Sequence, residues 1–197
     1  MPDNPKNKSH FIMKKSIIIH GLIGGCISIL GFFFMELYNG NSHNDISMMV
    51  GYASMLAAFS LIFVAIKNYR DKQNGGVISF GTAFKNGLLI ALVTSTVYVV
   101  AWLIYFTYFS PDFMEKYAQA TLSAMAKEGK SAAEIQKQAA EMKEFAEMYK
   151  NPLINAAVTY TEILPVGIIV SLLAAFILKK KPNPETDERA AFLAERQ

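Results

Sequence analysis

Glu162 is the residue whose type and position most suggest chemistry. It is the one charged residue inside the otherwise apolar run from Asn151 to Leu178. An ionised carboxylate at the centre of a membrane-spanning helix costs about 2.5–3.5 kcal/mol on insertion scales. No Lys or Arg lies within the apolar runs to pair with it. We therefore expect Glu162 to face the interior of a helix bundle and to be mostly protonated.

Polar residues that could share a pocket with Glu162 lie at matching depths. Asn155 precedes it by seven residues and so lies on the same helical face. Pro165 removes the N–H that would bond the carbonyl of Thr161, which loosens the helix one turn from the acid. In antiparallel helices three further side chains fall at about this depth: Ser28, Ser54 and Tyr98. The candidate intramembrane polar site is Glu162, Asn155, Pro165 and Tyr98.

Two kinds of chemistry remain open for this acid. As a neutral carboxyl group hydrogen-bonded between helices, Glu162 would only hold the bundle together. If its helix is shifted toward the outer membrane interface, the carboxyl group would instead be solvated. As a titrating group it would carry protons, as intramembrane acids do in pumps and transporters. The sequence does not choose between these readings.

Other chemistries find less support in the sequence. The three histidines, His10, His20 and His43, are too far apart in the chain to suggest a shared metal ion. The apolar runs contain no Asp, and no glycine-rich phosphate loop follows a strand. We expect no catalytic residues, no metal and no cofactor, so an enzyme is the least favoured class. The mild formal charge of +3 also argues against a nucleic-acid partner.

The elements that must position these residues are long apolar helices. Hydrophobic residues make up 52% of the 197 residues, and the charged 18% are gathered into blocks. Four runs between these blocks are long enough to cross about 30 Å of hydrocarbon as helices. We predict an all-α fold, a four-helix transmembrane bundle with spans at about 16–37, 46–66, 86–110 and 151–178. The membrane domain is then 16–178, flanked by tails at 1–15 and 179–197.

The distribution of basic residues predicts the orientation of the bundle. Lys clusters precede the first span, separate the second from the third, and follow the fourth. Short loops rich in Lys and Arg stay in the cytoplasm. We therefore expect both termini in the cytoplasm and the 111–150 segment on the opposite side.

Small residues indicate where the spans could pack closely. Apolar association gains little within lipid, so helices approach through Gly, Ala and Ser. Three such seams can be read from the sequence: Gly21 and Gly25; Gly87, Ala91 and Ser95; and Gly167, Ser171 and Ala175.

The sequence pattern of the segment 111–150 predicts an extracytoplasmic helical hairpin. Phe113, Tyr117, Ala120 and Ala124 recur with helical spacing in its first half. Ser131 and Glu134 form a capping-box pattern that opens a second helix, and a stripe follows on it: Ile135, Ala139, Met142, Ala146 and Tyr149. We expect the first helix to cover this stripe. The membrane surface or a partner protein could cover it instead, and the composition also fits a disordered or lipid-surface segment.

An ordered set of short motifs resembles a known family. The motifs are GVISFGTAFKNG at 76–87, WLIYF from Trp102, PDFM from Pro111 and LKKK from Leu178. In this order they resemble the bacterial domain of unknown function 4199 family over residues 13–181. The resemblance implies a four-helix, multi-pass protein of the bacterial inner membrane and no established activity.

Two functions are compatible with these features. The first is a non-catalytic interaction or structural component of the bacterial inner membrane that contacts an envelope protein, or a second copy of itself, through 111–150. The second is a small transporter or proton-coupled subunit centred on Glu162.

Overall fold

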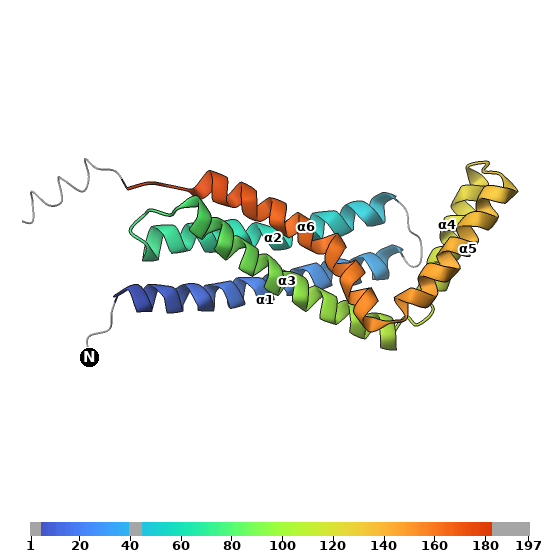
Figure 1. Cartoon of the computed structure of the whole chain (residues 1–197), viewed down its shortest axis with the longest axis horizontal. Coiled ribbons are helices and arrows are strands. Elements are labelled where there is room, and N and C mark those ends of the chain that lie inside the picture. The colour runs from blue at the N-terminus through green and yellow to red at the C-terminus, as the bar shows by residue number, and fades with distance from the viewer. Residues whose placement is uncertain (1–4, 40–44, 183–197) are drawn as a thin grey trace, which may run out of the picture.

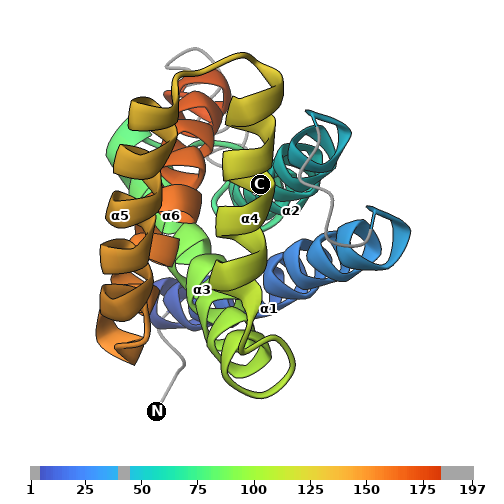
Figure 2. The ribbon, with the colours of Figure 1, turned by 90° about the vertical axis from the view of Figure 1, so that its right-hand side faces the viewer.

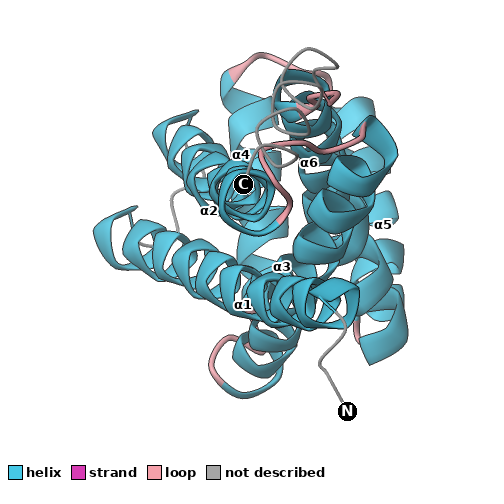
Figure 3. Cartoon of the chain, turned by 90° about the vertical axis from the view of Figure 1, so that its left-hand side faces the viewer, coloured by secondary structure: helices cyan, strands magenta, loops and turns pink. Residues whose placement is uncertain are grey.

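Six helices make up the part of the chain described by the computed structural model, residues 5–39 and 45–182. They are α1 (Pro5–Asn39), α2 (Asp45–Gln73), α3 (Phe80–Tyr108), α4 (Phe113–Lys127), α5 (Ala132–Tyr149) and α6 (Pro152–Leu178). Four of them, α1, α2, α3 and α6, lie side by side as an elongated bundle (Figure 1), and the loops among the described residues are short (Figure 3). The expected all-α bundle is confirmed. The expected tails at 1–15 and 179–197 fall partly outside the described residues.

The four bundle helices have the length and apolar composition to cross a membrane. These stretches are Ile12–Phe34, Met49–Gln73, Phe80–Tyr108 and Pro152–Leu178. The chain is therefore a multi-pass membrane protein. Both ends of the described chain lie at one end of the bundle, here called the terminal end, and α4 and α5 lie at the other, the hairpin end (Figure 1).

The loop between α2 and α3 is shorter than the charge pattern suggests. Helix α2 continues seven residues beyond the expected span end at 66, and α3 begins at Phe80, ahead of the expected span start at 86. The turn is set by Gly75 and Gly76, whose φ angles of 62° and 78° suit glycine, and by Ser79, which caps α3. Lys and Arg side chains can extend toward the headgroups from within a helix, so the first charge does not end it.

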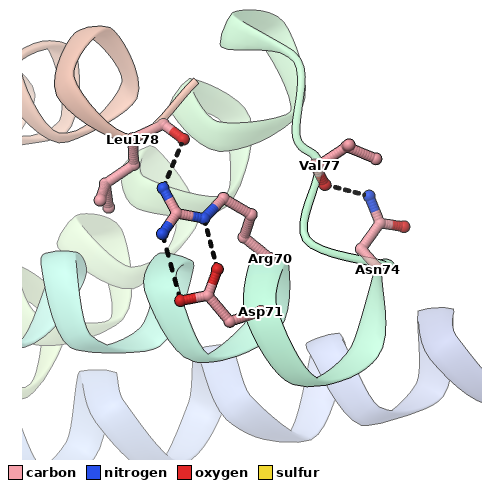
Figure 4. Close-up of polar contacts among 5 residues, drawn as sticks. All are labelled: Arg70, Asp71, Asn74, Val77 and Leu178. Carbon is pink, nitrogen blue, oxygen red and sulfur yellow. Dashed lines mark hydrogen bonds and ion pairs between the residues drawn. The ribbon is translucent and has the colours of Figure 1, made fainter. Parts of the chain in front are cut away.

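The terminal end is fastened by polar contacts between segments far apart in sequence (Figure 4). The Arg70 guanidinium donates to the Leu178 carbonyl at 3.1 Å and also contacts Asp71. A cation beside the carbonyls at a helix C-terminus satisfies orphan acceptors and complements the helix dipole. A two-bond bridge between Ile78 and Lys180 then ties the chain after α6 to the loop before α3.

The predicted seams of small residues lie at close helix contacts in the bundle. A Cβ placed on Gly167 of α6 would lie 2.8 Å from the Ala91 Cβ of α3, and one on Gly87 would lie 3.0 Å from Ser171 Cβ. Ser95 and Ala175 are also fully buried. On the other side of α3, a Cβ on Gly25 of α1 would lie 2.5 Å from Val97 Cβ. The seams are confirmed, and α3 lies between α1 and α6.

Helices α4 and α5 form an antiparallel pair that stands across the hairpin end of the bundle (Figure 2). Gly129, with φ of 76°, lies in the turn between them, and the capping box of Ser131 and Glu134 is present as predicted. On α5 the predicted stripe is confirmed, since Met142 and Tyr149 are buried and Ile135 is half-buried.

The expected face of α4 is confirmed at Phe113 and Ala120, which are half-buried, and wrong at two other positions. Tyr117 and Ala124 are exposed, whereas Met114 is buried and Ala118 is half-buried. Met114 and Ala118 line the same groove as Met142 of α5. Helix α4 is rotated relative to the expected orientation because Phe113 packs against Trp102 of the bundle, with ring centroids 5.0 Å apart.

Candidate functional site

A hydrogen-bonded cluster joins α3, α5 and α6 at the hairpin end. The Trp102 indole N–H points at two acceptors, the Asn155 Oδ1 at 2.9 Å and the Tyr149 hydroxyl at 3.0 Å. Thr159 donates to the Asn155 backbone carbonyl at 2.9 Å. Asn155 and Thr159 are almost fully buried. Unpaired polar groups are costly in such a setting, so this network fixes how α5 meets the bundle.

Aromatic rings surround this cluster. Trp102 makes edge contacts with Phe32 of α1 at 5.4 Å and with Phe113 of α4 at 5.0 Å, and Phe106 meets Tyr149 at 5.3 Å. Edge-to-face pairs of this kind contribute about 0.5–1.5 kcal/mol each beyond the burial of their surface. The aromatic cluster therefore attaches the hairpin to the bundle through several elements at once.

Burial in this cluster changes the acidity of the α5 tyrosine. Desolvation raises the pKa of the Tyr149 phenol, and hydrogen bonds with Thr159 and Trp102 act in the opposite direction without cancelling it. Tyr149 thus stays neutral across the physiological pH range, where it can both accept from Trp102 and donate.

A cavity of about 410 Å³ lies in the angle between the hairpin and the bundle. Four groups of residues form its wall: Phe32 of α1; Tyr98 and Trp102 of α3; Phe113, Met114, Tyr117, Phe145 and Tyr149 of the hairpin; Val158, Thr159 and Glu162 of α6. Its volume is in the range of small-molecule sites. Five helices therefore contribute to one hollow, which exists only because the hairpin is docked.

Glu162 lies in the wall of this cavity and not in the interior of the bundle, so the expected burial of its side chain is wrong. The side chain is exposed in the isolated chain, whereas its neighbour Ile163 is fully buried. The reason is the rotation of α6, which uses the face of Ile163, Gly167 and Val170 for packing. The carboxyl group is instead presented to the hollow beneath the hairpin.

The other predicted site residues separate into two groups. Tyr98 lines the cavity with Glu162, as the matching depth suggested. Asn155 lies on the Glu162 side of α6, but Trp102 covers it, so Asn155 supports the wall from behind. Thr159 lies between them on the same face of α6. Its hydroxyl donates to the Asn155 carbonyl, and its side chain lines the cavity together with Glu162.

Pro165 shapes the helix and is absent from the cavity wall. It lies inside α6, which changes direction along its length (Figure 1), as proline-containing helices commonly do. Pro165 is exposed, and nearby the Thr161 hydroxyl donates to the Val158 carbonyl at 2.6 Å. Its role is to set the path of the helix beside the acid.

Two serines expected at this depth do not reach the cavity. Ser28 is buried, and its hydroxyl has no hydrogen-bond partner among the described residues. Ser54 donates to the Gly51 carbonyl at 2.7 Å within α2. Its Cβ would clash with a Cβ placed on Gly31, so Ser54 packs closely against α1.

The residues that sequence reasoning missed are Trp102, Tyr149 and Thr159. Trp102 is the single tryptophan of the chain, which could have marked it as a site residue near a membrane interface. For Tyr149 and Thr159 the contact depends on how the hairpin docks, and no local pattern signals that.

The family model described as "Protein of unknown function (DUF4199)" matches residues 19–180, most of the chain. The chain belongs to the DUF4199 family. No curated protein and no solved structure matches it. The family description assigns no activity to a DUF4199 protein. A carboxyl group at the side of an aromatic hollow can hold a proton or pair with a cation.

Proposed function

We propose that this protein is a non-catalytic interaction component of the bacterial inner membrane, which contacts an envelope protein or a second copy of itself through the hairpin. One observation carries this proposal: α5 is fastened to the bundle through Tyr149 while its other faces are exposed. A rigid attachment reduces the ordering cost of binding, which favours a docking role over a loose loop.

The chemistry of the exposed faces supports a protein partner. On α5 they carry both signs of charge, in Lys137, Glu141, Lys143, Glu144 and Glu147. The contacts Lys137–Glu141 and Lys150–Glu147 are exposed ion pairs that add little to stability. Mixed charge of this kind suits complementary recognition, whereas a lipid surface would favour a basic and apolar face.

The proposed orientation places both termini in the cytoplasm. In support, the described basic residues at the terminal end are numerous: Lys14, Lys15, Lys67, Arg70, Lys72, Lys85 and Lys179 to Lys181. Short basic segments of this kind are retained inside. In a Cys26→Ser background, a cysteine at Lys130 should react with a membrane-impermeant maleimide in spheroplasts, and one at Asn74 should not. The reverse labelling would invert the orientation.

A photo-crosslinking experiment tests the interaction role. A benzophenone amino acid at Glu144, on the exposed face of α5, should give a discrete protein adduct in intact cells. The matched control is the same amino acid at Ile169, an exposed apolar position of α6 within the span, which should react with lipid. If Glu144 gives no discrete adduct, with either another protein or a second copy, the hairpin is not a docking surface.

A second candidate function is a small transporter or proton-coupled subunit centred on Glu162. The observation that favours it is the position of Glu162 in a cavity wall instead of a packed interface. The two candidates differ in their sensitivity to mutation. If cells with the Glu162→Gln protein keep the phenotype that deletion of the hairpin abolishes, the interaction role is supported and the transporter role is excluded. If Glu162→Gln abolishes it in a folded protein, the acid is essential.

A further inference from the structure

The cavity between the hairpin and the bundle has an unusual wall. Of its eleven lining residues, seven are aromatic and one, Glu162, is charged. No Lys, Arg or His is among the described residues that line it. The remaining members are Met114, Val158 and Thr159, which add little polarity. A hollow with one negative group and aromatic walls is complementary to a positive, largely apolar molecule.

We propose that this cavity binds an organic cation with apolar substituents, for which the Glu162 carboxylate is the counter-ion. The proposal deepens the second candidate function, on whose acid it rests, by naming the class of ligand. It requires no protein partner on the hairpin. Binding is also separable from transport, since a site can hold a cation without moving it.

The wall chemistry favours a cation over other ligands. The faces of Trp and Tyr rings attract organic cations, and the attraction is stronger when the cation is desolvated. An anion would meet the Glu162 carboxylate with no basic side chain to offset it. A hydrated inorganic cation such as Ca²⁺ or Mg²⁺ requires six or more oxygen ligands, and one carboxylate beside aromatic rings does not replace its water.

Trp102 is held in place for this role by the side chains around it. Its indole N–H is taken by Asn155 and Tyr149, so the ring offers the cavity only its aromatic surface. Phe32 and Phe113 pack against it from two sides. A ligand therefore meets a preformed wall, which lowers the entropic cost of binding.

Glu162 is the group whose charge changes on binding. The titratable residues that face it across the cavity are the phenols Tyr98 of α3, Tyr117 of α4 and Tyr149 of α5. Phe32 of α1 cannot titrate, and no described residue of α2 lines the cavity. If the empty site holds a neutral carboxyl group, cation entry releases one proton from Glu162 to water. The positive charge bound then equals the positive charge released.

The single tryptophan provides a direct test, since Trp102 lines the cavity and is the only indole in the chain. Purified full-length protein in nanodiscs of zwitterionic lipid is titrated with tetraphenylphosphonium. The control ligand is tetraphenylborate, an anion of nearly the same size and shape. N-acetyltryptophanamide in empty nanodiscs corrects for non-specific quenching.

The expected result is saturable quenching by the phosphonium and none by the borate. Glu162→Gln should weaken phosphonium affinity by about tenfold or more, whereas Glu144→Gln, the same change on the exposed face of α5, should not. Affinity should fall at about pH 5 compared with about pH 8, because protons then compete for Glu162. Val158→Phe, which fills the cavity and keeps the acid, should also abolish saturation and provides a second variant if Glu162→Gln misfolds.

The outcomes separate the inference from the function on which it rests. Equal quenching by phosphonium and borate, or unchanged phosphonium affinity in folded Glu162→Gln, would show apolar adsorption only and overturn the inference. Saturable, Glu162-dependent binding without phosphonium uptake into proteoliposomes would support the binding site and exclude the transport function.

Discussion

The Trp102 indole N–H donates to the Asn155 Oδ1 at 2.9 Å, and this contact joins α3 to α6 directly beneath the hairpin. The two residues are 53 positions apart in the chain. Both are buried, so the contact satisfies a buried polar group on each residue. The Trp102 N–H also has the Tyr149 hydroxyl as an acceptor, and the Asn155 Oδ1 also accepts from Thr159 at 3.4 Å.

Trp102→Phe should lower the free energy of unfolding by about 1 kcal/mol, because the Asn155 Oδ1 loses its shorter hydrogen bond and keeps only the 3.4 Å contact with Thr159. In Asn155→Leu the Trp102 N–H retains Tyr149 as an acceptor. The double variant should therefore lose less free energy of unfolding than the two single variants lose in total. Unfolding in mixed micelles, followed by circular dichroism, measures this coupling. Strict additivity would mean that the contact contributes nothing, and Tyr108→Phe on the exposed surface is the control.

Gly167→Ala should separate α3 from α6. The added Cβ would lie 2.8 Å from the Ala91 Cβ and 2.9 Å from the ring of Phe59, which is fully buried. Overpacking of this kind costs about 1–3 kcal/mol. Gly51→Ala on α2 is the matched control, since its Cβ would meet no atom within 4 Å. A Gly167→Ala protein as stable as the Gly51→Ala protein would show that the seam is loose.

Met142→Lys should open the hairpin, since it places a charge in the buried contact between α5 and α4. The expected loss of local stability is about 1–3 kcal/mol. Hydrogen exchange of amides across α4 and α5 measures it. Met148→Lys makes the same change at a position 47% exposed on the same helix and should leave exchange unchanged. Similar protection in both variants would contradict the observed packing.

Glu134 should show the acidity of a carboxylate in a capping box. Hydrogen bonds from the Ser131 side chain and backbone lower the pKa of Glu134. A lowered pKa in the folded state means that the contribution to α5 is present above the unfolded pKa and is lost as pH falls through the folded value. Ser131→Ala should raise the Glu134 pKa toward its ordinary range, as measured by carboxyl carbon shifts. An unchanged titration would show that the box does not form in solution.

Much of the fold is determined by the sequence alone, because the bilayer makes the relevant signals local. Each span must supply about twenty apolar residues and satisfy its own backbone, so length and composition are enough to count helices. Small-residue spacing also predicted close packing correctly at Gly25, Gly87 and Gly167. The capping box at Ser131 is a contact between near neighbours, and it too was predictable.

What only the tertiary structure decided is how these helices are rotated and where the hairpin rests. A helix turns by about 100° per residue, so a shift of one position exchanges Tyr117 for Ala118 on the packed face of α4. The same sensitivity places Ile163 in the core and Glu162 in the cavity wall. The cavity is bounded by residues from five helices, between Phe32 and Glu162 in the chain. Its existence depends on contacts across that whole distance, such as Trp102 with Tyr149, and a local sequence pattern carries no information about them.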